Sequence, residues 1–480
     1  MAASTIYPTG TTVYDPEKSW NGYTLYIARE TGAALIDMNG QVVHLWEGLQ
    51  GFPNKMLPGG HVMGSLGVRD PKFGFMDQTD VVQIDWDGNV VWKFDQYEYI
   101  EDPGQEGIWM ARQHHDFQRE GNPVGYYAPG MDPFVDKGNT LILGHKNLTN
   151  PKISDKMLVD DVIYEVSWDG EIVWEWVCSE HFDEMGFSEE AKNILSRNPT
   201  MVIGEGLVGD WMHINSVSTL GPNHWYDNGD ERFHPDNIIL SGRQTSISAI
   251  IDKKSGKIVW QIGPDYNSTP ELQKLGWIIG QHHTHMIPRG LPGEGNILVF
   301  DNGGFAGYGS PNPGSPTGHN NALREFSRVL EFDPVTLKVI WRYTYFEAGY
   351  LNRMGRYNFF SPLISSAQRL PNGNTMITEG STGRMLEVTP DNELVWEYVS
   401  PYFGMDGKSN SVYRAYRVPY EWVPQINKPK EVAVPRIDIS RFRVPGTEWK
   451  EEQRITKVKG ATGFFALPQL CVSDVIDEDD

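Results

Sequence analysis

One pattern of hydrophobic and polar positions recurs six times along the chain. Each copy has a short apolar run, a tight turn carried by Asp, Asn, Gly or a substitute, and a second run of alternating β-branched residues that ends on an aromatic side chain. The copies are IDMNGQVVHLW from Ile36, IDWDGNVVWKF from Ile84, VSWDGEIVWEW from Val166, IDKKSGKIVWQI from Ile251, FDPVTLKVIWRY from Phe332 and VTPDNELVWEY from Val388. Alternation with a period of two on both sides of a turn is typical of a β-hairpin. The pattern therefore predicts six related hairpins.

A second recurring pattern, a polar turn followed by a short apolar strand, lies upstream of the hairpins. It reads LPGGHVMGS from Leu57, GNTLILG from Gly138, PDNIILSG from Pro235, PGEGNILVF from Pro292 and LPNGNTMITEG from Leu370. We expect these segments to be the inner strands of blades. The hairpins start 48 to 85 residues apart, the spacing of a four-stranded sheet with variable loops. The sequence thus predicts an all-β protein, a six-bladed β-propeller over residues 1–420 with an extended C-terminal tail over 421–480 that packs on it.

Three further features refine this picture. The segment FSEEAKNILSR predicts a single inserted helix with Ser188 as its N-cap. The Gly- and Pro-rich segment 305–321 is interpreted as a lid, or else as an idle insertion. The tryptophans that end the hairpins are expected to pack between neighbouring blades; they are Trp46, Trp92, Trp174, Trp260, Trp341 and Trp396.

Composition narrows the range of partners and compartments. A formal net charge of −22 argues against binding to nucleic acid or to an anionic membrane surface. The two cysteines, Cys178 and Cys471, provide neither a disulfide framework nor a cysteine-based metal site. The beginning of the chain lacks the pattern of a signal peptide and no apolar run has transmembrane length, which predicts a cytoplasmic protein, or a periplasmic one if a signal has been removed. The sequence leaves a homo-oligomer open.

Histidines gather at comparable points of three neighbouring predicted blades. The strings QHHDF, DWMHINSV and QHHTHMIP contain His114, His115, His213, His282, His283 and His285. Corresponding points of successive blades converge on the axis of a propeller, so we expect these side chains to line one central mouth. Each could also be an ordinary polar residue of a wet channel. The other histidines are interpreted as ordinary, with His145 a marginal candidate.

The chemistry of this cluster has several interpretations. Imidazoles can bind a metal, move protons, or act as a covalent nucleophile. Arg243, in IILSGRQTS, adds a fixed cation whose planar donors suit a sulfate, phosphate or carboxylate. This side chain favours an anionic substrate, although a salt bridge at a blade edge is its alternative role.

Several motifs taken in order resemble the bacterial arylsulfotransferases, the PAPS-independent aryl-sulfate sulfotransferases. They are PTGTTVYDPEKSWNGYTLY, IDMNGQVVHLW, HIN, the strand ending SGR, and QH followed by GNILVFDNGG, and the resemblance runs from about residue 8 to residue 419. It implies a six-bladed propeller. It also implies ping-pong transfer of a sulfuryl group from a small aromatic anion, an aryl sulfate, to a phenolic acceptor through a sulfo-histidine, with no cofactor.

The resemblance assigns roles to individual residues. His282 would be the nucleophile, His213 would act beside it, Asn215 and Arg243 match the sulfate-binding motifs, and His114 or His115 matches the remaining channel histidine. The additional His283 and His285 are predicted to contact substrate. The short-range disulfide of the family has no counterpart here.

The number of imidazoles exceeds what sulfuryl transfer needs, which supports two alternatives. In the first, His114, His213, His282 and His285 bind a divalent metal ion, and the chain is an oxygenase, lyase or hydrolase acting on a small aromatic or anionic substrate. In the second, the chain is a non-catalytic, ligand-binding propeller.

Overall fold

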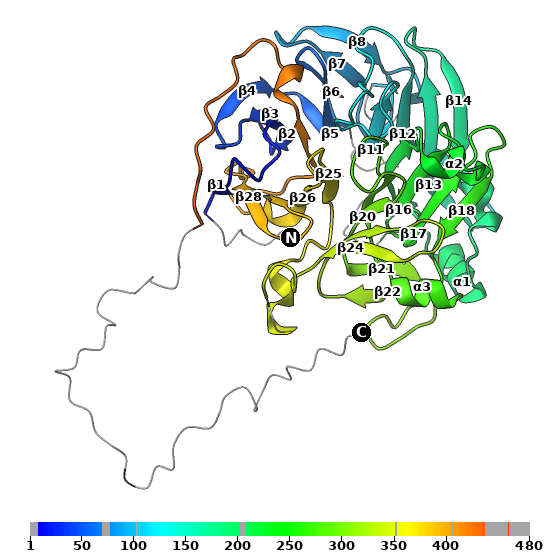
Figure 1. The fold of residues 1–480 in the computed structure, drawn as a ribbon. Helices are drawn as coiled ribbons and strands as arrows, with labels where there is room; N and C mark the ends of the chain where they lie inside the picture. Colours follow the sequence, from blue (N-terminus) through cyan, green and yellow to red (C-terminus); the bar gives the residue numbers. More distant parts are fainter. Residues whose placement is uncertain are drawn as a thin grey trace.

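The computed structural model describes residues 8–69, 77–101, 104, 106–201, 208–350, 353–405, 407–436 and 459. These residues form six antiparallel sheets arranged around a common axis (Figure 1). The protein is a six-bladed β-propeller, as the sequence predicts. No helix in the described ranges is both long enough and apolar enough to cross a membrane.

Each blade begins with an innermost strand at the axis and ends with an outermost strand at the rim. Blade 1 consists, in this order, of β29 (Ala415–Val418), β2 (Tyr23–Ala28), β3 (Gly32–Ile36) and β4 (Val42–Glu47), and blade 2 of β5 (Gln50–Leu57), β6 (His61–Ser65), β7 (Val81–Ile84) and β8 (Val90–Phe94). Blade 3 consists of β11 (Gln113–Arg119), β12 (Thr140–Asn150), β13 (Ser154–Val166) and β14 (Ile172–Val177), and blade 4 of β15 (Ile214–Thr219), β16 (Ile238–Gly242), β17 (Ile247–Ile251) and β18 (Ile258–Ile262). Blade 5 consists of β19 (His282–Met286), β20 (Ile297–Asp301), β23 (Arg328–Phe332) and β24 (Val339–Tyr343), and blade 6 of β25 (Ser366–Arg369), β26 (Thr375–Glu379), β27 (Arg384–Val388), β28 (Leu394–Val399) and β1 (Gly10–Tyr14).

The six predicted hairpins form the third and fourth strands of the blades, from β3–β4 to β27–β28. The second recurring pattern forms β6, β12, β16, β20 and β26, which are the second strands. They lie inside the outer hairpins, as expected of inner strands, but one further strand lies between each of them and the axis. The innermost strands include the polar segments of β11 and β19, and consecutive innermost strands contact one another around the axis. An apolar pattern misses them because they face the axis of the ring.

The tryptophans that end the hairpins connect each blade to the next. Every indole Nε1 donates a hydrogen bond to a backbone carbonyl in the hairpin turn of the following blade. The pairs are Trp46 with Asp85, Trp92 with Trp168, Trp174 with Lys253, Trp260 with Pro334, Trp341 with Pro390, and Trp396 with Met38. The last pair joins blade 6 to blade 1, so the bonds form a closed cycle. The predicted packing between blades is confirmed.

Both ends of the chain close the ring. The N-terminal strand β1 is the outermost strand of blade 6, and the C-terminal strand β29 is the innermost strand of blade 1 (Figure 1). After β29 the chain lies against the ring, where Val434 exchanges two backbone hydrogen bonds with Tyr14. Residues 437–480 of the predicted tail, apart from Lys459, lie outside the described residues.

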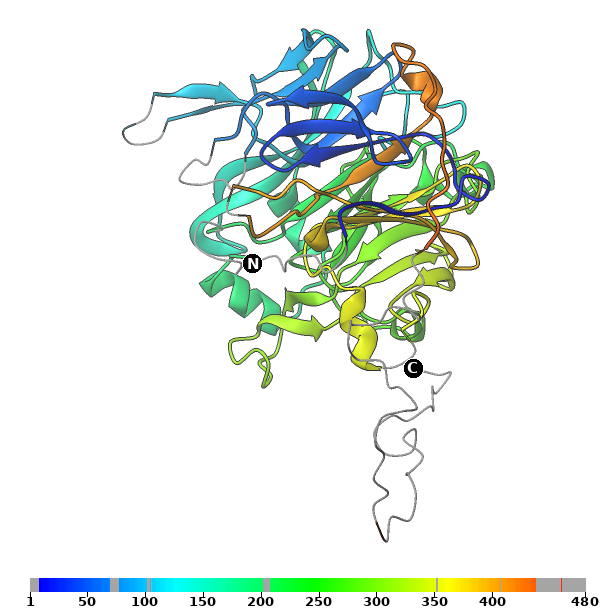
Figure 2. The ribbon, with the colours of Figure 1, turned by 90° about the vertical axis from the view of Figure 1, so that its left-hand side faces the viewer.

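Insertions gather on one side of the ring (Figure 2). They are the hairpin β9 (Glu98–Ile100) and β10 (Ile108–Met110), helix α1 (Glu189–Arg197), and the hairpin β21 (Gly304–Tyr308) and β22 (His319–Arg324). The predicted cap of α1 is confirmed, since the Ser188 side chain accepts a hydrogen bond from the N–H of Ala191. The segment predicted as a lid lies within the β21–β22 hairpin, which packs against α1.

Short helices that the sequence did not predict occupy the remaining connections. They are α2 (His224–Asp227), α3 (Pro270–Leu275), and the 3-10 helices η1 (Cys178–Glu184), η2 (Glu231–Phe233), η3 (Arg353–Asn358), η4 (Gly380–Thr382) and η5 (Tyr420–Trp422).

Candidate functional site

The innermost strands of blades 3, 4 and 5 are bent where the histidines lie. His115, His213 and His283 all have left-handed backbone conformations, with φ between 52° and 55°. The pairing register also shifts near these residues in all three blades. This irregularity arises because a bulge places extra residues opposite the partner strand. Simple alternation along these strands is therefore a poor guide to which side chains share a face.

The register shows which points of the innermost strands correspond. Gly144, Gly242 and Asp301 occupy the same position of the second strands in blades 3, 4 and 5. Gln113 pairs with Gly144 and Ile214 with Gly242, while His282 pairs with Phe300, one residue before Asp301. His114 follows Gln113 by one residue, so His114 and His282 lie at comparable points, whereas His213 precedes Ile214 and lies earlier in its blade. Their side chains meet, or separate, according to the local bulge.

His115 and His213 form the first group of imidazoles. Their ring centroids lie 4.5 Å apart with an interplanar angle of 79°. Tyr413, which lies just before β29, donates its hydroxyl toward the carbonyl oxygens of His115 and Asn215, both at 3.0 Å. His213 Nδ1 lies 2.6 Å from Asp210 Oδ2. Burial, and the neighbouring His213, hold the pKa of His115 well below its usual range, so this ring is neutral.

His282 has a fixed tautomer. The Asn302 Nδ2 donates to the carbonyl oxygens of Ser361 and Ile364, each at 2.7 Å, so its amide oxygen must face His282. The Asn302 Oδ1 lies 2.8 Å from His282 Nδ1. Because the oxygen can only accept, Nδ1 carries the proton and Nε2 carries the lone pair. Burial also lowers the pKa of His282 well below its usual range, which keeps this lone pair free.

Arg243 is a buried cation without a carboxylate partner among the described residues. Its Nη1 donates to Gln244 Oε1 at 3.2 Å, whereas Nε and Nη2 have no hydrogen-bond partner in the described ranges. The guanidinium lies over the ring of Phe305, from β21, at 4.9 Å. Burial lowers its pKa to about 10, so it remains charged at neutral pH. The alternative role, a salt bridge at a blade edge, is not found in the described part of the chain.

Asn215 lies beside this group on β15. Its Nδ2 donates to the carbonyl oxygen of Gln281 at 2.6 Å, directly before His282. Its Oδ1 is buried and has no hydrogen-bond partner among the described residues. Asn215 therefore links blade 4 to the strand that carries His282.

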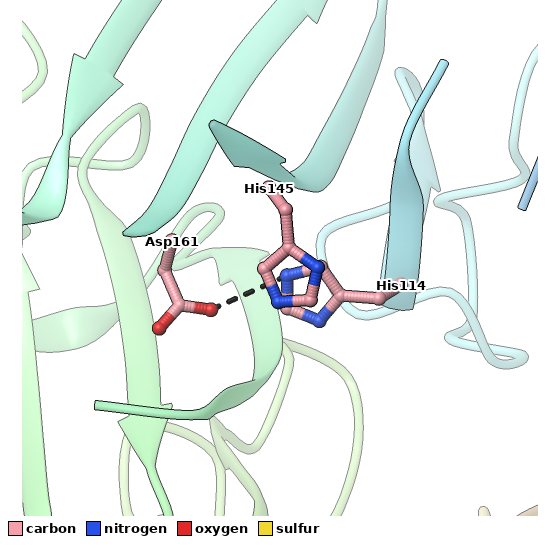
Figure 3. Close-up of side chains that lie close together, drawn as sticks. All are labelled: His114, His145 and Asp161. Carbon is pink, nitrogen blue, oxygen red and sulfur yellow. Dashed lines mark ion pairs between the residues drawn. The ribbon is translucent and has the colours of Figure 1, made fainter. Parts of the chain in front are cut away.

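His114 lies beside His145 and Asp161 of blade 3 (Figure 3). Its ring stacks on that of His145, with centroids 3.6 Å apart and planes 13° apart. Its Nε2 lies 3.2 Å from Asp161 Oδ1, and its Nδ1 lies 2.8 Å from His115 Nδ1. Burial lowers the pKa of His114 to about 4. A second carboxylate lies close by, since Asp77 Oδ1 is 2.6 Å from His145 Nδ1.

His283 and His285 belong to a different part of the site. Their rings lie 4.3 Å apart, and among described residues their other ring contacts are with Tyr126 and Tyr416. His285 Nδ1 donates to the carbonyl oxygen of His283 at 2.8 Å, and its Nε2 accepts from the Tyr126 hydroxyl at 2.9 Å. No ring contact in the described ranges joins this pair to His115 or His213.

A buried ion cluster stabilises the strands that carry the site. Asp116 Oδ1 lies 2.6 Å from Lys55 Nζ, and its Oδ2 lies 2.9 Å from Arg414 Nη1. The Arg414 Nη2 also donates to the carbonyl oxygen of Asn215. Charge-assisted hydrogen bonds therefore connect blades 2, 3 and 4 to the segment just before β29, which carries Arg414.

Sequence reasoning missed residues that the structure brings to the site. They are Asp77, Asp161, Asp210, Asn302 and Tyr413, and His145 was only a marginal candidate. One signal for His145 was available, because His145 and Arg243 each follow the corresponding glycine of a second strand, in LILGHK and IILSGR. Their N–H groups bond equivalent carbonyl oxygens, those of Arg112 and His213. Comparison of the two strands would have indicated His145.

Among the described residues, one group could hold a metal ion, namely His114, His145 and Asp161, whose ligand atoms lie within 4.8 Å of one another. It shares only His114 with the four metal ligands that the sequence predicted.

The fold is a β-propeller whose innermost strands carry buried imidazoles beside Arg243, whose Nε and Nη2 have no hydrogen-bond partner among the described residues. The sequence pattern of the family Arylsulfotransferase (ASST) matches residues 133–414, more than half of the chain. The chain belongs to the arylsulfotransferase family. The matched span contains His213, Asn215, Arg243 and His282, and is shorter than the resemblance seen in the sequence. No curated protein matches the sequence.

Several solved structures are similar at low identity. A protein of unknown function from Bacteroides caccae has 10% identity and a TM-score of 0.41, over 83% of this chain and 100% of that one. The β-propeller domain of Cps50 (Swd1) from Myceliophteria thermophila has 9% identity and a TM-score of 0.37, over 83% and 90%. A streptogramin B lyase structure has 9% identity and a TM-score of 0.34, over 86% and 95%.

Proposed function

We propose that this arylsulfotransferase-family protein transfers a sulfuryl group from an aryl sulfate to a phenolic acceptor, with His282 as the covalent carrier. The observation that carries the proposal is the fixed tautomer of His282. Its Nδ1 proton is held by Asn302 Oδ1 and its Nε2 lone pair is not protonated at neutral pH. A nucleophilic imidazole needs this arrangement.

In the first half-reaction, Nε2 of His282 forms a bond to sulfur while the bond from sulfur to the aryl oxygen breaks. His282 does not have to lose a proton, because Nδ1 keeps its hydrogen on Asn302 and the new positive charge of the ring is offset by the sulfonate. The two free donors of Arg243 suit the sulfonate oxygens, on which negative charge is spread.

The departing phenolate has to gain a proton. His213 is suited to supply it from Nε2, because the Asp210 carboxylate on Nδ1 compensates for an imidazolium charge. In the second half-reaction the phenol of the acceptor attacks sulfur, the bond from nitrogen to sulfur breaks, and His213 takes back the proton. The neutral ring of His115 packs edge-on against His213.

The test is to mix the protein with a chromogenic aryl sulfate without an acceptor and to follow phenol release and protein mass. We expect a burst of phenol and the addition of one sulfuryl group to His282. His282→Ala should give neither. Asn302→Leu should slow sulfation roughly 10²- to 10⁴-fold with a small change in KM, since the tautomer is no longer held.

His234→Ala is the matched control, because this histidine is partly exposed and lies outside the site. It should sulfate at the rate of the unmodified protein. Sulfation that persists in His282→Ala, or that maps to another histidine, would show that His282 is not the carrier.

A further inference from the structure

The histidines that sulfuryl transfer does not use include a buried pair on blade 3. His114, His145 and Asp161 come from β11, β12 and β13, three adjacent strands of one sheet. His145 and Asp161 are direct cross-strand partners. Opposed residues of neighbouring strands place their side chains on the same face, and His114 reaches this face from the bulge of β11 (Figure 3).

The polar atoms that meet on this face lack hydrogen bonds within the described residues. They are His114 Nε2, His145 Nε2 and Asp161 Oδ1, and all three are buried. The approach of 3.2 Å between His114 Nε2 and Asp161 Oδ1 is not aligned as a hydrogen bond. Buried polar atoms are satisfied in the great majority of instances. Three such atoms that converge within 4.8 Å therefore indicate a ligand that accepts lone pairs from all of them.

The outer atoms of the same side chains are, by contrast, all bonded. His145 Nδ1 lies 2.6 Å from Asp77 Oδ1, and Asp161 Oδ2 accepts from the N–H of Ile214 at 3.0 Å. Asp77 is itself held by Arg112 Nε at 2.8 Å. A carboxylate behind a ligating imidazole is the usual outer shell of a histidine bound to a metal, because it orients the ring and raises the basicity of the free nitrogen.

The buried charges around this position also favour a bound cation. Asp77, Asp161 and Asp210 are buried around this position. Arg112 pairs with Asp77 and Glu98, and Arg243 interacts with Asp210 through space. A dication would offset the excess of carboxylates. The donor set of two imidazole nitrogens and one carboxylate oxygen suits zinc and similar divalent transition metals better than magnesium or calcium.

We propose that His114 Nε2, His145 Nε2 and Asp161 Oδ1 form a binding site for one divalent transition-metal ion of the zinc type inside blade 3. Because the two rings are stacked, one of them has to rotate for both lone pairs to point at a single ion. With the ion on Nε2, His114 keeps its proton on Nδ1 and donates it to His115 Nδ1. The metal thereby fixes the tautomer of His115 with its proton on Nε2. The site does not depend on the proposed function.

The test uses the full chain without a polyhistidine tag. The protein is stripped with a chelator, incubated with Zn²⁺ or Co²⁺ and desalted, and its metal content is measured together with the visible absorption of Co²⁺. We expect about one ion per chain, with d–d bands from nitrogen and oxygen ligands. The metal should also raise the melting temperature, because it binds only the folded state.

Three variants and one control decide the outcome. His145→Ala and Asp161→Asn should lose the ion and the metal-dependent rise in melting temperature. Asp77→Asn keeps all three ligands and should weaken binding roughly 10- to 100-fold. His234→Ala should bind like the unmodified protein. The proposal is overturned if the folded, unmodified protein retains no metal, or if Asp161→Asn and His145→Ala retain as much as the control. An aryl-sulfate assay on the stripped protein tests the transfer function separately.

Discussion

At the scale of single residues, burial keeps the imidazoles neutral. His114 and His285 both have a pKa of about 4, with desolvation as the main cause, while Arg243 and Arg414 stay charged. Neutral imidazoles beside a retained cation form a site that can accept an anion without losing the lone pairs of its bases. The same burial makes the stability of the protein depend on pH.

The contribution of one residue to the pH dependence of stability can be measured at His285. Its pKa falls from about 6.5 in the unfolded chain to about 4 in the folded protein. The unfolded state therefore takes up the proton first as pH falls, and the stability that neutral His285 provides is present above about pH 6.5 and lost toward pH 4. We expect the difference in free energy of unfolding between the protein and His285→Gln to shrink over this range. Urea titrations at several pH values measure it, and a constant difference would contradict the shifted pKa.

At the scale of elements, the cycle of indole bonds connects hairpins that share no ladder of backbone hydrogen bonds in the described ranges. The Trp260 bond to the carbonyl oxygen of Pro334, at 2.7 Å, is buried, whereas the Trp341 bond to Pro390, at 3.1 Å, is exposed. Loss of a buried bond leaves a carbonyl unsatisfied, but water can replace an exposed one.

We therefore expect Trp260→Phe to lower the free energy of unfolding by about 1–3 kcal/mol through the lost hydrogen bond. Trp341→Phe, which removes the same atoms from an exposed position, serves as the matched control and should have a smaller effect. Denaturant unfolding followed by circular dichroism measures both. Equal losses would indicate packing rather than the hydrogen bond as the main contribution of these tryptophans.

At the scale of the whole molecule, the two ends of the chain close the ring, and Arg417 lies at this closure. It is fully buried on β29, and its Nη1 lies 3.1 Å from Glu387 Oε2 on β27 of blade 6. Its Nε donates to Thr24 Oγ1 at 2.8 Å, and its guanidinium lies over the ring of Trp396 at 4.5 Å. One side chain thus joins the first blade to the last.

Arg417→Met should destabilise the protein by about 3–5 kcal/mol, because Glu387 is then left as a buried charge without its cation. The double variant Arg417→Met, Glu387→Gln removes that charge and should recover part of the loss. Unfolding followed by fluorescence and by circular dichroism measures the change. If the double variant is no more stable than the single one, the ion pair is not the reason for the loss.

The number of blades, the outer hairpins and the tryptophan at the end of each could all be predicted from the sequence. These features depend on residues close together in the chain, whose alternation and turn chemistry are independent of distant partners. The sequence also indicated His213, Asn215, Arg243 and His282 together, because they lie in short motifs on successive blades.

The division of the histidines into separate groups, by contrast, became visible only in the folded ring. The bulge in β11 lets the His114 ring stack on His145 while its Nδ1 lies 2.8 Å from His115 Nδ1, and no local pattern specifies the direction of such a turn. Asp77 lies 68 residues from His145, and Tyr413 lies 298 residues from His115. Contacts at such separations arise only when the ring closes, because closure brings the innermost strands together at one axis. The repeated hairpins thus determine where imidazoles can gather, and the packing around the axis determines which of them share a carboxylate, a tautomer or a free lone pair.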